Sequence, residues 1–174
     1  MNLALLVLHV VIGAVFLAHG TQKIFGWFGG PGVATTAGFF ENIGLRPGRV
    51  HAWAAALAET IGGLLLALGL FTPIGSALVI AVMTAAIITV HGTKGFFNTD
   101  GGYEFNLTLI AAAFALAGLG PGQWSLDNVV GLDWHGTSWA LIALGAGLLG
   151  GIAAVLQGHA VSATPGDRVR PTAA

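Results

Sequence analysis

The sequence predicts an all-α fold, a polytopic bundle of transmembrane helices. Only 7% of its 174 residues are charged and 55% are hydrophobic, and the mean hydropathy is +0.85. A soluble domain has roughly 25% charged residues, so this chain has too few polar groups to cover its own surface. The apolar residues form long stretches without the alternation of barrel strands. Because the backbone must be satisfied internally in lipid, these stretches are expected to be helices.

Five apolar stretches are long enough to be interpreted as membrane spans. A hydrocarbon core of about 30 Å requires roughly 20 helical residues at 1.5 Å per residue. The expected spans are residues 3–20, 51–71, 73–92, 103–120 and 138–157, of which the fourth is the shortest. The first lacks the basic segment that begins a signal peptide, and we expect it to remain as a helix. Residues 1–160 are therefore predicted to form one membrane domain.

The connections between the spans also carry structural signals. The long first loop contains a turn-rich run, residues 26–32, that no helix can cross intact. Residues 33–43 then place apolar side chains at helical spacing, which predicts a short amphipathic helix in the membrane interface. Pro73 suits the first turn of the third span. The fourth loop is expected to form an outer aromatic belt, with Asp127 and Asp133 among its residues Trp124, Trp134 and Trp139.

Basic residues are confined to alternate loops and the tail. They are Lys23, Arg46, Arg49, Lys94, Arg168 and Arg170. Short loops rich in Lys and Arg stay in the cytoplasm, so the N-terminus is predicted outside the cell and the C-terminus inside. Residues 161–174 are predicted to form a flexible cytoplasmic tail.

Composition narrows the range of functions. The net charge of −1 gives no reason to expect nucleic acid as a partner. The chain has no cysteine, which excludes an internal disulfide, a thiolate metal site or a dithiol relay. Gly147 and Gly151 form a GxxxG spacing that favours packing within the chain over dimerisation, although an oligomer remains open.

Polar residues from four spans gather near the predicted cytoplasmic side. His19 and Lys23 share one helix face at i,i+4 spacing, and Glu59 lies about 12 Å into the second span. A carboxylate inside a membrane is costly unless it is paired, neutralised or hydrated, so it marks a site by default. Lys23 is its natural counter-charge, with His19 or His91 as a hydrogen-bond partner. The alternative is a structural ion pair that ties two helices together.

We therefore expect Glu59, His19 and His91 to carry chemistry, while Lys23, Tyr103, Glu104 and Asn106 bind a ligand. His19 and His91 each have a second interpretation, as interfacial histidines bonded to a loop carbonyl. A bis-histidine haem would lack a second pair, and His19, Glu59 and His91 match no zinc spacing. Neither haem nor metal is expected, and a quinone remains open as the cofactor.

Four blocks of the sequence resemble the DoxX family of small bacterial integral membrane proteins. They are His19–Gly32, Glu59–Thr72, His91–Glu104 and Gly120–Asp127, within a continuous resemblance over about residues 3–127. The core of that family is usually a four-helix membrane bundle. The resemblance thus implies a four-helix DoxX-like core to which this chain adds a fifth, C-terminal transmembrane helix.

The resemblance also implies a location in the bacterial inner membrane and a link to redox chemistry. The family takes its name from subunits of membrane complexes that pass electrons from sulfur compounds, such as thiosulfate, to quinone. Other members are membrane partners of soluble redox enzymes. The polar positions that match the family are His19, Lys23, Glu59, His91 and Glu104. The chain contains no motif for flavin, iron–sulfur cluster or nicotinamide, so electrons would come from a soluble redox enzyme or another membrane subunit.

Three hypotheses for function follow from these patterns. The first is a redox-associated subunit that holds a quinone-like headgroup near His19, Lys23, Glu59 and His91. The second is a non-enzymatic scaffold that docks soluble partners through its cytoplasmic loops and tail. The third, transport of a small solute, has no broken helix or inverted repeat in its favour.

The predicted orientation can be tested with topology reporters. A reporter fused after Thr164 should be active as a cytoplasmic fusion, and one placed within residues 121–137 as an external fusion, because the basic loops stay inside. The opposite pattern of activity would overturn the five-span count or its direction.

Overall fold

The computed structural model describes residues 2–162, and no strand occurs in that range. Its long helices are α1 (Asn2–Phe25), α3 (Gly48–Leu68), α4 (Thr72–Ala86), α5 (Glu104–Leu119) and α7 (Thr137–Ser162), joined by the shorter α2 (Gly32–Asn42) and α6 (Leu126–Val129). Within these residues, segments 3–25, 48–68, 72–94 and 137–161 are long and apolar enough to cross a membrane. The predicted all-α membrane bundle is confirmed. Of the predicted tail, residues 163–174 lie outside the described range.

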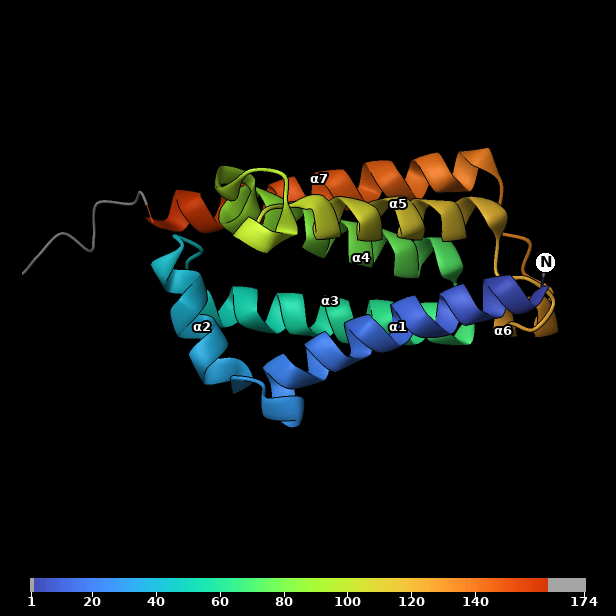
Figure 1. The fold of residues 1–174 in the computed structure, drawn as a ribbon, viewed down its shortest axis with the longest axis horizontal. Coiled ribbons are helices and arrows are strands. Elements are labelled where there is room, and N and C mark those ends of the chain that lie inside the picture. The colour runs from blue at the N-terminus through green and yellow to red at the C-terminus, as the bar shows by residue number, and fades with distance from the viewer. Residues whose placement is uncertain (1, 163–174) are drawn as a thin grey trace, which may run out of the picture.

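The helices form two layers that meet lengthwise (Figure 1). One layer pairs α1 with α3, and the other combines α4, α7 and α5. The N-terminus and α6 lie at one end of the bundle, which we call the α6 end, and α2 lies at the opposite α2 end. The 16-residue α5 spans only about 24 Å along its axis, yet it packs beside α4 and α7. It therefore completes the second layer.

Two helix boundaries differ from those expected, and local capping explains both. The structure extends α1 past residue 20 to Phe25, where Gly26 adopts a left-handed conformation (φ 72°) and donates to the Gln22 carbonyl at 3.1 Å. This is a common way to end a helix, and it places Lys23 inside α1 rather than in the loop. Similarly, left-handed Gly69 (φ 57°) ends α3 at Leu68, before the expected residue 71.

The last helix and the end of α4 also depart from the predicted bounds. The 26 residues of α7 measure about 39 Å, so α7 extends beyond a hydrocarbon core of about 30 Å. After Ala86 the chain continues as a π-helical turn, Ile87–His91. Such turns are rare and are often found at functional sites. The amphipathic segment expected at residues 33–43 forms α2, Gly32–Asn42.

Glycines allow the paired helices to touch through their backbones. A Cβ atom at Gly13 of α1 would lie 2.6 Å from the Gly63 carbonyl oxygen of α3, and one at Gly147 of α7 would lie 2.5 Å from the Ile80 Cβ of α4. A Cβ atom at Gly151 would lie 2.5 Å from the Ala81 carbonyl oxygen. The Gly147–Gly151 spacing thus packs within the chain, as the sequence favours. Small residues have this role where lipid gives no hydrophobic drive.

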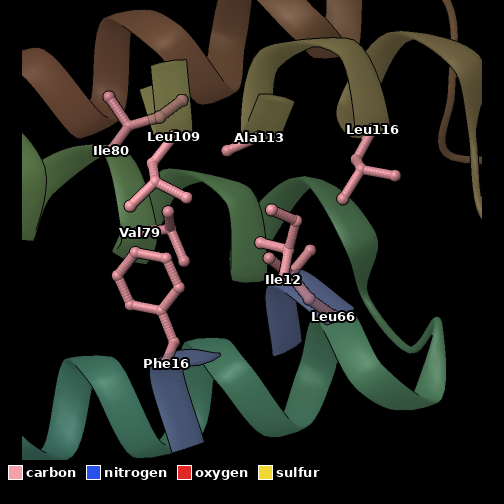
Figure 2. Packing of buried hydrophobic residues seen from close by; sticks show 8 residues of the cluster. All are labelled: Ile12, Phe16, Leu66, Val79, Ile80, Leu109, Ala113 and Leu116. Carbon is pink, nitrogen blue, oxygen red and sulfur yellow. The ribbon is translucent and has the colours of Figure 1, made fainter. Parts of the chain in front are cut away.

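One apolar core joins the two layers (Figure 2). Its buried side chains come from α1, α3, α4 and α5, and they are Ile12, Phe16, Leu66, Val79, Ile80, Leu109, Ala113 and Leu116. The outward surface is apolar as well: Leu149 is 69% exposed and Leu156 is 64% exposed. So much exposed apolar surface suits a lipid environment rather than water.

Asp127 does not lie at the surface of the loop after α5, where it was expected beside the tryptophans of an outer aromatic belt. Asp127 is fully buried and accepts hydrogen bonds from the backbone N–H groups of Phe71 and Thr72, at 2.8 and 3.2 Å. The Thr72 hydroxyl donates a third bond at 3.1 Å. A carboxylate that caps the N-terminus of α4 also complements the helix dipole. Asp127 therefore fastens α6 to the α3–α4 hairpin instead of facing outward.

Neighbouring glycines of α7 provide a matched test of this packing. Gly151→Ala forces a Cβ atom against α4, whereas a Cβ atom at Gly150 would meet only ordinary contact, 3.6 Å from the Ala81 Cβ. Overpacking costs about 1–3 kcal/mol, so Gly151→Ala should unfold at a lower temperature in detergent than Gly150→Ala. Equal melting temperatures would show that the α4–α7 seam tolerates a methyl group.

Candidate functional site

A cavity of about 500 Å³ lies between the layers at the α2 end of the bundle. Phe16 and Leu109 belong both to the core and to the cavity wall, so the cavity begins where the core ends. Its lining includes residues from α1, α2, α3, α5 and α7 and from α4 with its π-helical turn. Five of the seven predicted site residues line it: His19, Lys23, Glu59, His91 and Asn106. Residues that are far apart in the sequence thus share one chamber.

A buried ion pair stands at the wall of the cavity. The Lys23 Nζ atom donates to Glu59 Oε2 at 2.6 Å, and the exposed fractions of the two side chains are 20% and 4%. The pair joins the last turn of α1 to the middle of α3. It forms there because Gly20 lets α1 approach α3 closely: a Cβ atom at Gly20 would lie 2.7 Å from the Thr60 backbone nitrogen.

One face of α3 lines the cavity along its length. The lining residues of α3 are His51, Ala54, Ala55, Ala58 and Glu59, at spacings of three and four residues that share one helix face. His51 and Glu59 are separated by about 12 Å along the axis. The opposite wall mixes larger apolar side chains, such as Met83 and Val155, with small residues, namely Ala81, Ala85, Ala86, Gly150, Gly151 and Ala154. The chamber is therefore an apolar slot with a polar residue at each end of its α3 wall.

His51 is a cavity residue that the sequence analysis missed. It is only 5% exposed, and its Nε2 atom has no hydrogen-bond partner among the described residues. A buried polar atom without a partner costs about 1–3 kcal/mol, and this atom is packed against α7, where a Cβ atom at Gly158 would lie 2.9 Å from it. The i,i+8 spacing between His51 and Glu59 was the available signal, since it places both on one face of α3.

His91 and Asn106 line the cavity with their polar groups already engaged. The Nδ1 atom of His91 lies 2.6 Å from the Gly101 carbonyl oxygen, which matches the second interpretation of this histidine, a bond to a loop carbonyl. The Asn106 Nδ2 atom donates to Met83 Sδ at 3.3 Å. These bonds orient the two side chains within the wall formed by α4, its π-helical turn and α5.

Tyr103 and Glu104 lie outside the cavity lining. The Tyr103 ring meets the Phe96 ring edge-on, with centroids 5.5 Å apart. Glu104 Oε2 accepts a hydrogen bond from the Asn98 backbone nitrogen at 2.9 Å. Both contacts shape the loop that leads into α5, so the structure gives these two residues a local structural role at the α2 end.

Among the described residues, no three His, Asp or Glu side chains lie close enough to hold a metal ion. His9, near the α6 end, is buried with Nδ1 2.8 Å from the Leu66 carbonyl oxygen. This contact through Nδ1 links α1 to α3.

Comparisons with known proteins identify relatives of this chain. A family model described as DoxX matches residues 4–92. A Bacillus subtilis protein named "Putative oxidoreductase CatD" is 35% identical over 125 residues, which cover 72% of this chain and 85% of that protein. The Mycobacterium tuberculosis protein "Uncharacterized membrane protein Rv3486" is 28% identical over 132 residues, which cover 70% of this chain and 77% of that protein. No solved structure gives a significant match.

The Lys23–Glu59 pair predicts a characteristic stability pattern. Lys23→Met leaves a buried carboxylate without its partner; such a loss costs about 3–5 kcal/mol, and the partial exposure of Lys23 places this pair near the lower limit. The double variant Lys23→Met, Glu59→Met removes both charges and should recover most of the lost thermal stability in detergent. If the double variant is no more stable than Lys23→Met, the two side chains are not coupled as described.

Proposed function

The chain belongs to the DoxX family of membrane proteins, and from this premise we propose that it is a redox-associated membrane subunit that binds a quinone-like molecule in the cavity. The observation that carries the proposal is the apolar cavity with the buried Lys23–Glu59 pair in its wall. The relative from Bacillus subtilis, which is named an oxidoreductase, is consistent with a redox role.

The size and charge of the cavity favour an uncharged amphiphile. Sites for small molecules usually enclose about 300–1,000 Å³, with mostly apolar walls and a few placed polar groups; this cavity encloses about 500 Å³. Lys23 is paired with Glu59, and among the described residues no other Lys, Arg, Asp or Glu lines the chamber, so it offers no unpaired acid or base to attract an ion. The alanines and glycines of its walls leave space for a ring and the first part of an apolar tail.

Several side chains of this chain could hold the oxygens of such a molecule. The Lys23 ammonium has three donors, and its bond to Glu59 uses one of them. His19 lies one turn earlier on the same face of α1 and also lines the cavity. A quinone takes up two electrons and two protons on reduction. In this proposal Lys23 or His19 donates to an oxygen, Glu59 relays protons, and a redox partner supplies the electrons.

The proposal includes a direction across the bacterial inner membrane. Lys23, Arg46, Arg49 and Lys94 all lie on helix ends or loops at the α2 end. Since basic loops stay in the cytoplasm, the α2 end faces inward and the N-terminus outward. The cavity then lies in the cytoplasmic half of the membrane, within reach of a soluble redox enzyme or another membrane subunit.

Quinone content after purification tests the proposal. We expect stoichiometric quinone in lipid extracts of the protein purified in mild detergent, and its loss in Glu59→Gln and in Ala58→Phe. The first variant removes the carboxylate, and the second fills the slot without changing a charge. Extracts are analysed by chromatography and mass spectrometry.

Asp133→Asn is the matched control, because Asp133 is highly exposed and lies far from the cavity in the loop after α6. It should retain quinone at the unsubstituted level. Absence of quinone from the unsubstituted protein, or equal quinone in Ala58→Phe, would contradict binding in this chamber.

A further inference from the structure

Three polar side chains stand in the part of the cavity wall that is formed by α4, its π-helical turn and α5. They are Thr89, His91 and Asn106. Thr89 and His91 come from the π-helical turn, and Asn106 comes from the first turn of α5. Each side chain already uses a donor within the protein, and we call the three the acceptor wall because of the capacity that this leaves.

The protons of Thr89 and His91 are both committed. The Thr89 hydroxyl donates to the Ala85 carbonyl at 2.8 Å, and since a hydroxyl has one proton, Oγ1 can only accept from a ligand. The His91 Nδ1 atom lies 2.6 Å from the Gly101 carbonyl oxygen, outside the cavity lining. A carbonyl cannot donate, so Nδ1 carries the proton. The neutral ring is then left with an acceptor lone pair on Nε2.

Asn106 and Glu59 each add an oxygen that can accept. Asn106 is 5% exposed and donates through Nδ2 to Met83 Sδ, while Glu59 is 3% exposed and accepts from Lys23 through Oε2. Among the described residues, no hydrogen bond reaches the other oxygens, Asn106 Oδ1 and Glu59 Oε1, and neither oxygen is sealed off by protein atoms. Both side chains line the cavity, so these oxygens are open to it.

Donors in the cavity are fewer, and they do not distinguish the two redox forms of a quinone. The Lys23 ammonium has three donors and uses one of them for Glu59. A quinone carbonyl and a quinol hydroxyl can both accept from such a donor. Only the hydroxyl can also donate, whereas a carbonyl oxygen placed at the acceptor wall would face other lone pairs.

We propose that the cavity selects the reduced form of its ligand, a quinol whose hydroxyl groups donate to the acceptor wall. This inference rests on the proposed function and adds the redox form that the site recognises. A site that hydrogen-bonds a hydroxyl discriminates strongly against the analogue without it, because its buried acceptors are then left unpaired. By linkage, tighter binding of the quinol raises the midpoint potential of the bound couple.

The affinities of the two redox forms test this inference. Decylubiquinol and decylubiquinone are each titrated into the full chain in detergent, under anaerobic conditions, by isothermal titration calorimetry. We expect the quinol to bind about tenfold more tightly, which for a two-electron couple corresponds to a rise of about 30 mV in the potential of the bound couple. Thr89→Val and Asn106→Leu each remove an acceptor with little change of shape, and each should lower the ratio of the two affinities.

Thr108→Val is the matched control. Thr108 also donates its hydroxyl to a carbonyl one turn earlier, that of Glu104 at 2.9 Å, but it is exposed and lies outside the cavity lining. This variant should keep the full ratio. Equal binding of the two forms, or a ratio unchanged in both Thr89→Val and Asn106→Leu, would overturn the inference and leave the proposed function standing. If neither form binds, the proposed function fails as well.

Discussion

Close backbone contact between helices is the constraint on which the other features depend. Within a membrane, lipid tails are as apolar as leucine, so helices associate through tight packing rather than through loss of water. Gly13, Gly20 and Gly63 bring α1 against α3, while Gly147 and Gly151 bring α7 against α4. These seams create two layers, and the layers share a single core around Phe16 and Leu66. The cavity occupies the space beyond that core, towards the α2 end.

The same seams allow a charged pair to exist inside the bundle. Gly20 removes the side chain that would keep α1 away from α3, and Lys23 on the next turn then reaches Glu59 at 2.6 Å. A charged side chain alone is costly in this environment. The pair satisfies both groups and leaves Lys23 with further hydrogen-bond donors. The Lys23–Glu59 pair therefore ties two helices together, and the same pair is available as a polar contact for a ligand.

Two chambers adjoin this pair. Towards the bundle interior, alanines and glycines of α3, α4 and α7 leave an open apolar slot, with the His51 ring in its wall. Towards α2, a smaller chamber of about 350 Å³ is lined by Gln22, Thr35 and Thr36 together with Phe39 and Phe40. The two phenylalanines belong to both linings, so α2 separates the two chambers.

The sequence alone determined the membrane class, the all-α fold, the short helix α2 and the pairing of Glu59 with Lys23. These features follow from runs of apolar residues, turn residues and rare charges, all of which are visible locally along the chain. Only the tertiary structure decided that His51 lines the cavity, that Asp127 is buried as a helix cap, and that Tyr103 and Glu104 lie outside the chamber. The physical reason is that burial depends on which helices meet. Which helices meet is set by the close contacts at glycines and by the layers that these contacts build, not by the hydropathy of any one segment.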